Sequence, residues 1–405
     1  MTPGSSSASR RVLFVAEDIT LAQVARLLAL AERLPNELYE VHFACGSFDP
    51  VLFAGTSFRR WPLFTIERER ALKAVAKGER IYDAATLERY LQDELRLLAE
   101  IRPHVVVGDF RLSLSVSARL ASVHVASLIN AYWSPFAVRE AFPVPDHPIV
   151  RLLGIERAER YFPQALPKVF AHFAAPLNAL RRRHGLDEFA SLEHQLCFGD
   201  SVLYPDLPEL CPVVGAPPSH LFLGAVPWSP RVALPLQLTE GDPAWPLVYV
   251  TLGSSGDVGA LPAVLAGLEG LPLRGVLATA GRQAPSKVPG NFRVAEYVPG
   301  HVLASQAAFV VTNGGSSTGY QALAAGAPVL GIPSNLDQYL AMQAIERAGV
   351  GVVLRSGGLS SAQVRTAAIR LLDAPGVKTK AEALARCFAA RDCHEHFQHW
   401  LRTVS

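Results

Sequence analysis

A glycine-rich turn followed by hydroxyl side chains is the densest chemical signal in this chain. It lies within residues 310–319, which have the pattern of a buried strand, a turn and the first turn of a helix. The turn residues are Asn313, Gly314, Gly315, Ser316, Ser317 and Thr318. Glycine lets a backbone approach an anion closely, and a helix N-terminus offers unpaired N–H groups with a partial positive charge. The pattern predicts a phosphate-binding turn, with a purely structural corner between strand and helix as the alternative.

A second polar turn follows the next strand and opens the next helix. It ends in Asp337 and Gln338, whose carboxylate and amide suit the hydroxyl groups of a polyol. A diphosphate site beside a polyol site is what a nucleotide sugar requires. We therefore expect the two turns to bind parts of one ligand.

Residues 315–319 also fit Gly-x-Ser-x-Gly, the nucleophile elbow of α/β-hydrolases, with Ser317 as the nucleophile. An acid and a histidine follow in the order of that triad, namely Asp337 or Asp373 and then His394, His396 or His399. This alternative is disfavoured because the elbow comes late in the chain and leaves the Asp337–Gln338 pair unexplained.

The elements that must position these turns alternate between short apolar runs and amphipathic helices. In the first half, strands are expected over 12–16, 39–45, 105–107 and 123–129, and helices over 21–34, 87–101 and 113–121. In the second half, strands are expected over 247–252, 275–279, 292–295, 308–311, 328–332 and 350–354, and helices over 258–269, 316–325, 337–348 and 393–403. Strands that alternate with helices form parallel sheets, so the fold class is α/β with two such halves.

The composition shifts divide the chain into domains. Residues 1–212 are expected to form a first domain, residues 213–245 a Pro- and Gly-rich linker, and residues 246–389 a second domain. Residues 130–200 interrupt the rhythm and are expected to add helices and loops to the first domain. Ligands of open α/β sheets bind beyond the carboxyl ends of the strands, so two facing domains place a site in the cleft between them.

Residues 297–351 resemble the donor-binding signature of the inverting, nucleotide-sugar-dependent family 1 glycosyltransferases, which include UDP-glycosyltransferases and bacterial macrolide and antibiotic glycosyltransferases. The matching segments are Tyr297-Val298-Pro299, residues 313–318, Gly326-Ala327-Pro328 and Asp337-Gln338. The resemblance is strong over roughly 245–355 and weaker over 11–130. It implies the GT-B architecture, two Rossmann-like domains facing each other across a cleft, with the acceptor bound by the first domain and the donor by the second. It also implies that residues 390–405 pack back on the first domain.

The resemblance assigns roles to individual donor-site residues. Tyr297 would lie against the base and the backbone of Val298 would bind it, while Asp337 and Gln338 would hold the sugar. The residues around the diphosphate would be Gly253, Ser254, Ser255, Asn313, Gly314, Gly315, Ser316, Ser317 and Thr318. The co-substrate would be a UDP- or dTDP-sugar, with no further cofactor and no metal. The phosphate-binding His of the family is Asn313 here, and Gly300 replaces a Gln, which loosens any inference that the base is uracil.

The catalytic base departs from the family pattern. Its His or Asp falls at or near Gln23, which cannot usefully accept a proton. Asp18 and Glu17 are the carboxylates of the same loop, and Asp109 resembles the acid that orients the base. Our hypothesis is that the proton goes to Asp18, or else to Asp109 or a group of the substrate. Asp is also a favoured helix cap, so the structural alternative is that Asp18 only caps the helix that starts near Thr20.

Four aromatic side chains lie in the irregular segment of the first domain: Tyr132, Trp133, Phe136 and Phe142. Aromatic clusters are often core, but clustering with prolines outside the α/β rhythm favours a binding loop. We expect them to bind a small, hydrophobic or aromatic acceptor, such as a natural product or lipid.

Charge and cysteine content exclude several other classes. The formal net charge of +2 gives no electrostatic reason for a nucleic-acid partner. No apolar run reaches the roughly 20 residues of a membrane span, and the polar first ten residues do not read as a signal peptide. Five scattered cysteines favour a reducing cytoplasm, where the protein is expected, with peripheral membrane association and a homo-oligomer left open.

A nucleotide-sugar-binding helper or pseudoenzyme is the non-enzyme alternative.

Overall fold

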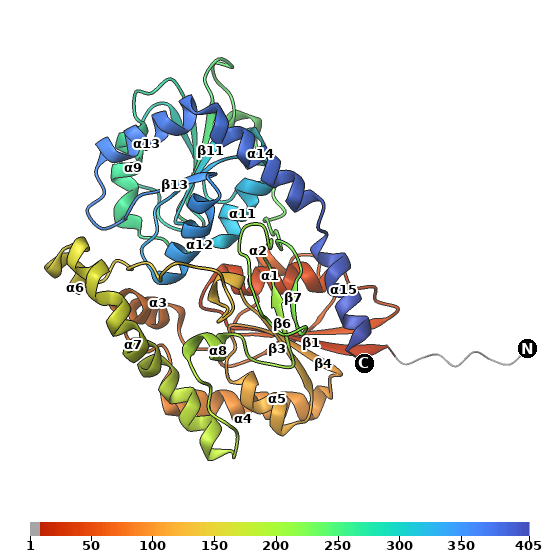
Figure 1. Ribbon diagram of the computed structural model, residues 1–405. Coiled ribbons are helices and arrows are strands. Elements are labelled where there is room, and N and C mark those ends of the chain that lie inside the picture. Colours follow the sequence, from red (N-terminus) through yellow and green to blue (C-terminus); the bar gives the residue numbers. More distant parts are fainter. Residues whose placement is uncertain (1–8, 405) are drawn as a thin grey trace, which may run out of the picture.

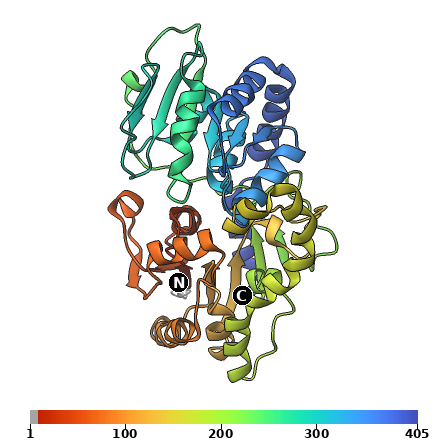
Figure 2. The ribbon, with the colours of Figure 1, turned by 90° about the vertical axis from the view of Figure 1, so that its left-hand side faces the viewer.

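The computed structural model describes residues 9–404, and the side chain of Arg151 is not among its described features. The polar start of the chain, residues 1–8, lies outside the described residues. The molecule has two lobes, with the N-terminal half in one and most of the C-terminal half in the other (Figures 1 and 2). This is the α/β arrangement of two facing Rossmann-like domains that the sequence predicts.

A seven-stranded parallel sheet forms the centre of the first domain, in the order β3-β2-β1-β4-β5-β6-β7. Its strands are β1 Arg10–Ala16, β2 Tyr39–Cys45, β3 Arg59–Pro62, β4 Val105–Asp109, β5 His124–Leu128, β6 Ser201–Tyr204 and β7 His220–Phe222. Its helices are α1 Leu21–Ala31, α2 Pro50–Phe53, α3 Arg68–Lys77, α4 Ala84–Ile101, α5 Leu114–Leu120, η1 Ala131–Trp133, α6 Pro148–Leu153, α7 Ile155–Arg183 and α8 Leu192–Leu196.

β1 shows why the apolar runs of this domain are continuous. Val12, Phe14 and Ala16 belong to one buried cluster, whereas Leu13 and Val15 belong to another. Successive side chains point to opposite faces of a sheet, and helices cover both faces here. The same feature made the strand recognisable in the sequence.

A six-stranded parallel sheet forms the second domain, in the order β10-β9-β8-β11-β12-β13. Its strands are β8 Leu247–Thr251, β9 Arg274–Ala278, β10 Phe292–Ala295, β11 Ala307–Thr312, β12 Val329–Gly331 and β13 Gly351–Val353. Its helices are η2 Leu236–Leu238, η3 Val258–Ala260, α9 Leu261–Leu268, α10 Gly300–Gln306, α11 Ser316–Ala324, α12 Leu336–Arg347, α13 Ser361–Asp373 and α14 Pro375–Ala389. One more helix, α15 Cys393–Thr403, follows them at the end of the described chain.

The first domain extends beyond its expected end at residue 212. β7 pairs in parallel with β6, so the sheet reaches Phe222 and the connection to the second domain starts after it. The strand has only three residues and follows a Pro- and Gly-rich stretch, which hid it in the sequence. The irregular segment also contains a 29-residue helix, α7, with three internal prolines.

The last helix, α15, leaves the second lobe and lies along the first (Figure 1). Its Phe397, Trp400 and Leu401 join the buried cluster that contains Phe14, and Trp400 Nε1 donates a hydrogen bond to Ser201 Oγ at 3.1 Å. Arg10 donates to the carbonyl oxygens of Leu401 and Val404 at 2.8 Å each. The first domain is thus completed by residues from the end of the chain.

A loop of the first domain is fastened to the second by one carboxylate. Asp146 accepts hydrogen bonds from Ser356 Oγ and Gly357 N at 2.8 Å each and from Tyr339 OH at 3.1 Å. The Arg355 guanidinium pairs with the same carboxylate. This loop follows the aromatic segment, so the contact holds that segment against the second domain.

Candidate active site

Several of the predicted site residues follow the strands at which the order of each sheet reverses. In the first sheet the reversal lies between β1 and β4, and in the second between β8 and β11. Such switch points open a crevice beyond the carboxyl ends of parallel strands. Glu17 and Asp18 follow β1, Asp109 ends β4, and the two glycine-rich turns follow β8 and β11.

The turn after β11 is closed by Asn313. Its Oδ1 accepts a hydrogen bond from the Gly315 N–H at 3.1 Å, and its Nδ2 donates to Ser255 Oγ at 3.3 Å. Gly314 has a φ of +81°, and a Cβ there would lie 2.7 Å from Met342 Cγ. The turn therefore needs glycine at this position, and Asn313 ties it to the turn after β8.

The turn after β8 begins at Gly253, which has a φ of +58°. Arg282, in the loop after β9, holds it by donating through Nη1 to Gly256 O at 2.7 Å and through Nη2 to Ser254 O. Arg282 was not predicted, because it lies outside the motifs and acts on the turn through backbone carbonyl groups. Burial lowers the pKa of this arginine.

The two residues predicted to contact the base, Tyr297 and Val298, come next, and Tyr297 lies beside the loop that carries Arg282. Val298 is buried, and Tyr297 is half-buried with its hydroxyl so close to Gly281 that a Cβ there would lie 2.5 Å away. Burial raises the pKa of Tyr297, and the charge of Asp49, which belongs to the first domain, raises it further. Tyr297 therefore faces the boundary between the domains.

The second polar turn meets the predicted acceptor aromatics. Asp337 Oδ1 accepts a hydrogen bond from Trp133 Nε1 at 2.7 Å and from Tyr132 OH at 3.2 Å. Gln338 is buried, and its side-chain oxygen accepts from Ser334 N at 2.9 Å. A predicted sugar-binding group of one domain thus touches predicted acceptor residues of the other.

The four aromatic residues do not form one group. Phe142 packs edge-on against Phe170 of α7, with ring centroids 5.1 Å apart, and Trp133 lies 6.4 Å from Phe142. Phe136 instead packs against His220 of β7 at 5.4 Å. Tyr132, Trp133 and Phe142 therefore lie together on the side of α7 and α12, while Phe136 lies elsewhere.

Asp18 lies in the loop after β1 with its side chain 10 % exposed. Its carboxylate accepts a hydrogen bond from Ser47 Oγ at 2.5 Å and pairs with Arg68 at 3.2 Å. The capping alternative for Asp18 is wrong, because Thr20 is the N-cap residue of α1. Gln23, at the expected base position, closes that cap by accepting from Thr20 N at 3.0 Å.

Glu17 is completely buried and faces away from the cleft into a charged network. Its carboxylate accepts a hydrogen bond from Tyr90 OH at 2.7 Å and lies 3.5 Å from Arg111 Nη1. Arg111 also pairs with Glu94, so its guanidinium lies between the two glutamates. Burial raises the pKa of Glu17 to about 7, against the opposing charge of Arg111. The geometry gives Glu17 a structural role and no access to an acceptor.

Asp109 is also buried, but it points to the domain boundary. Both its oxygens accept hydrogen bonds from Arg26, at 3.0 Å from Nε and 2.9 Å from Nη2. Arg26 Nη1 donates to Asn130 Oδ1 at 2.7 Å, and that oxygen also accepts from Ser316 Oγ at 3.3 Å. Burial raises the pKa of Asp109 to about 6, while the charge of Arg26 opposes this. Neither Arg26 nor Asn130 was predicted, and no sequence spacing signals their meeting.

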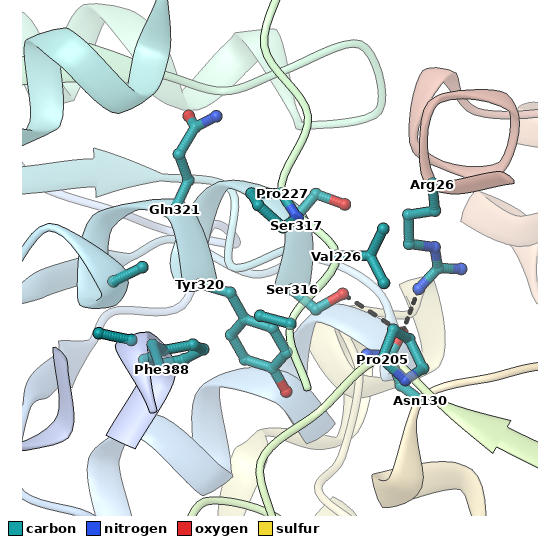
Figure 3. A pocket seen from close by; sticks show the side chains of 13 residues that line it. Arg26, Asn130, Pro205, Val226, Pro227, Ser316, Ser317, Tyr320, Gln321 and Phe388 are labelled. Atoms are coloured by element: carbon teal, nitrogen blue, oxygen red, sulfur yellow. Dashed lines mark hydrogen bonds between the residues drawn. The ribbon is translucent and has the colours of Figure 1, made fainter. Parts of the chain in front are cut away.

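An interdomain cavity of about 170 Å³ lies at this chain of contacts. Figure 3 shows the Arg26 side chain from α1 and Ser316 from α11 converging on Asn130 at one side of it. Its polar lining comes from both domains: Arg26, Asn130, Ser316, Ser317 and Gln321. Apolar groups of the connecting segment, including Val226 and Pro227, also line it. Two of the predicted phosphate-site residues therefore open into a cavity shared with the first domain.

The hydrolase triad is not assembled. Its candidate histidines lie on α15, which packs against the first domain, and no hydrogen bond among residues 9–404 joins Ser317 to a histidine. Asp392, Cys393 and His394 group at the start of α15 as possible metal ligands. Asp392 already caps that helix, accepting from the N–H of His394 at 2.8 Å.

Comparisons with known proteins agree on one family. Residues 274–400 match the model of the erythromycin biosynthesis protein CIII-like C-terminal domain. The chain is 44% identical over 98% of its length, and 93% of the relative's, to a "PGL/p-HBAD biosynthesis glycosyltransferase" of Mycobacterium tuberculosis (strain ATCC 25177 / H37Ra). It is 45% identical to a "PGL/p-HBAD biosynthesis rhamnosyltransferase" of Mycobacterium bovis (strain BCG / Pasteur 1173P2), over 95% of this chain and 86% of that one. A relative described as inactive is 44% identical over 63% of this chain and 70% of its own length.

Solved structures show the same fold. The spinosyn forosaminyltransferase SpnP matches with a TM-score of 0.72 at 19% identity, covering 98% of this chain and 100% of its own. The spinosyn rhamnosyltransferase SpnG complexed with thymidine diphosphate matches with a TM-score of 0.69 at 20% identity, covering 98% and 99%. Over residues 9–404, no helix combines the length and apolar character needed to cross a membrane.

Proposed function

Because this chain belongs to the antibiotic-type family 1 glycosyltransferases, we propose that it transfers a sugar from a nucleoside diphosphate sugar to a small hydrophobic or aromatic acceptor, with inversion at the anomeric carbon. The observation that carries the proposal is the hydrogen bond from Asn313 Nδ2 to Ser255 Oγ. It joins the two glycine-rich turns at the switch point of the second sheet, where a diphosphate can reach both.

The donor would lie along the second domain. Its base would rest against Tyr297, its diphosphate against the turns, and its sugar against Asp337 and Gln338. Charge that develops on the departing diphosphate would meet the N-terminus of α11 and the nearby hydroxyl groups.

The reaction would be a single displacement. The acceptor oxygen bonds to the anomeric carbon as the bond from that carbon to the phosphate oxygen breaks, and the nucleoside diphosphate leaves with the electron pair. The hydroxyl proton passes to Asp18. Asp18 is preferred as the base because its side chain is 10 % exposed, whereas Asp109 and Glu17 are buried at 1 % and 0 %.

A dTDP-linked deoxysugar such as rhamnose is the donor we favour. One relative is described as a rhamnosyltransferase, and a rhamnosyltransferase with the same fold is described in complex with thymidine diphosphate. The acceptor would lie beside Tyr132, Trp133 and Phe142, whose faces suit an aromatic or lipid-like molecule. We place the reaction in the cytoplasm, with small molecules as the partners.

The test is binding followed by product analysis. Purified protein should melt at a higher temperature with dTDP than with UDP, since ligand binding stabilises by mass action. With dTDP-rhamnose and a panel of small phenols, mass spectrometry should detect acceptors heavier by one deoxyhexose. Absence of a thermal shift with every nucleotide tested would contradict the proposal.

A nucleotide-sugar-binding helper is the second candidate, favoured by the neutral Asn313 and Gln23 and by the inactive relative. It predicts nucleotide binding with neither transfer nor slow hydrolysis of the donor. The same assay therefore separates the two functions.

A further inference from the structure

Arg26 is a buried cation that faces the cavity from the first domain. Only 9 % of the residue is exposed, and it lines the cavity together with Ser316 and Ser317 (Figure 3). Three of its N–H groups donate to Asp109 and Asn130 in the described part of the chain. Nη1 and Nη2 each carry a second hydrogen, so donors remain beyond these bonds.

The glycine-rich turns lack a cation of their own. Residues 253–256 and 313–318 contain glycine, serine, asparagine and threonine, and none of these side chains is positively charged. A nucleoside diphosphate is negatively charged, and the backbone N–H groups and hydroxyls of the turns are all neutral hydrogen-bond donors. A guanidinium forms stronger, charge-assisted hydrogen bonds with phosphate oxygens.

We propose that Arg26 binds the diphosphate of the donor across the domain boundary and supplies the cationic contact that the turns of the second domain lack. This inference rests on the proposed function, because it takes the donor diphosphate to lie at the turns. Arg26 would also stabilise the charge that remains on the diphosphate when the sugar leaves.

The pairing with Asp109 prepares Arg26 for this role. The carboxylate takes one edge of the guanidinium through Nε and Nη2, and Asn130 takes one hydrogen of Nη1. These bonds hold the planar group in one orientation beside Ser316, whose hydroxyl bonds to the same Asn130 oxygen. Burial disfavours the charged form, but the Asp109 carboxylate outweighs it and raises the pKa of Arg26. The cation therefore persists at neutral pH and is already oriented.

Arg282 is the rival cation near the turns. Its Nη1 and Nη2 donate to the carbonyl oxygens of Gly256 and Ser254, so it supports the turn after β8 from behind. It does not line the cavity into which Ser316 and Ser317 open. Arg26 is therefore the cation that shares a cavity with the N-terminus of α11.

The experiment compares diphosphate and nucleoside binding by calorimetry in the full chain. Arg26→Met should lower the affinity for dTDP by roughly 10- to 100-fold, the range of a hydrogen bond to a charged group, and leave the affinity for thymidine unchanged. Arg26→Lys should recover part of the dTDP affinity, since it restores the charge without the fork of donors. Thermal unfolding checks that each variant is folded.

Arg26→Met leaves Asp109 buried without its partner, so a second variant removes that problem. The double variant with Asp109→Asn should show the same selective loss of dTDP affinity. Arg10→Met is the matched control, because it removes another first-domain arginine that bonds to backbone oxygens far from the cavity lining, and it should bind dTDP like the wild type.

Equal losses for dTDP and thymidine, or an unchanged dTDP affinity in both Arg26 variants, would overturn the role of Arg26 while leaving the glycosyltransferase proposal intact. A wild-type protein that binds no nucleotide would overturn both. A wild type that binds dTDP without transferring sugar, with the selective loss still seen in Arg26→Met, would support the Arg26 contact and contradict the proposed transfer.

Discussion

The two sides of the interdomain site are built from opposite chemistry. In the second domain, the turns after β8 and β11 present backbone N–H groups, hydroxyls and an amide, held by small residues in tight conformations. In the first domain, the ends of β1 and β4 carry buried charges, namely Glu17, Glu94 and Arg111 in one network and Arg26 with Asp109 in the other. The comparison teaches that substitutions in the second domain's turns are limited by the space around the backbone, whereas substitutions at the end of the first sheet are limited by the balance of buried charges.

The largest effect is expected at the proposed base. Asp18→Asn keeps an acceptor for the Ser47 hydroxyl but removes the proton acceptor, so turnover with saturating donor should fall by roughly 10²–10⁴-fold. The affinity for dTDP, measured by calorimetry, should stay unchanged. Full turnover in this variant would contradict Asp18 as the base and move that role to Asp109 or to a group of the substrate.

The charge balance of the first domain is tested by Arg111→Met. It strands Glu17 and Glu94 in the interior, and removing one partner of a buried ionic network costs about 3–5 kcal/mol of unfolding free energy. Urea unfolding measures the loss. Arg119→Met, which removes a half-exposed pair with Asp200, is the control and should cost under about 1 kcal/mol. Similar losses in the two variants would show that the network does not limit stability.

The shape requirement of the second domain is tested by Gly314→Ala. A positive φ and a Cβ contact at 2.7 Å should cost about 1–3 kcal/mol and distort the phosphate turn, so dTDP affinity should fall together with the melting temperature. Gly290→Ala is the control, since a Cβ there meets nothing within 4 Å. Unaltered dTDP binding in Gly314→Ala would place the diphosphate elsewhere.

A change in the pH dependence of stability is expected at Glu17. Its folded pKa of about 7 lies above the ordinary value of 4.5, so the folded state binds more protons in between. This group therefore lowers the unfolding free energy as the pH rises from 4.5 to about 7. Glu17→Gln should flatten that part of the profile, measured by urea unfolding at several pH values. Asp109, whose pKa is raised to about 6, adds a slope of the same sign that both proteins retain. An unchanged profile would show that Glu17 is already ionised across this range.

The sequence allowed the sheets and the two glycine-rich turns to be predicted because both are local patterns. β2 at Tyr39–Cys45 and β10 at Phe292–Ala295 have the bounds that their apolar runs indicate. β7 escaped prediction because three residues carry no periodicity, and the prolines of α7 obscured a long helix.

The charged side of the site could not be predicted in the same way. Arg26 and Asp109 are 83 positions apart, and Asn130 meets Ser316 across 186 positions. The first contact depends on how α1 and β4 pack within the first domain, and the second on how the two domains sit against each other. No spacing in the chain encodes either arrangement. Glu17 shows the converse error, since its place beside Asp18 suggested chemistry while its side chain points into the core.

The return of α15 to the first lobe has a practical consequence for engineering. Truncation within the connecting segment would separate Phe14 and its neighbours from α15, which covers them. The isolated first domain would then expose a hydrophobic surface and tend to aggregate. Chimeras that exchange donor specificity with a relative should therefore graft an internal cassette ending before Cys393, and keep the native tail with the native front half.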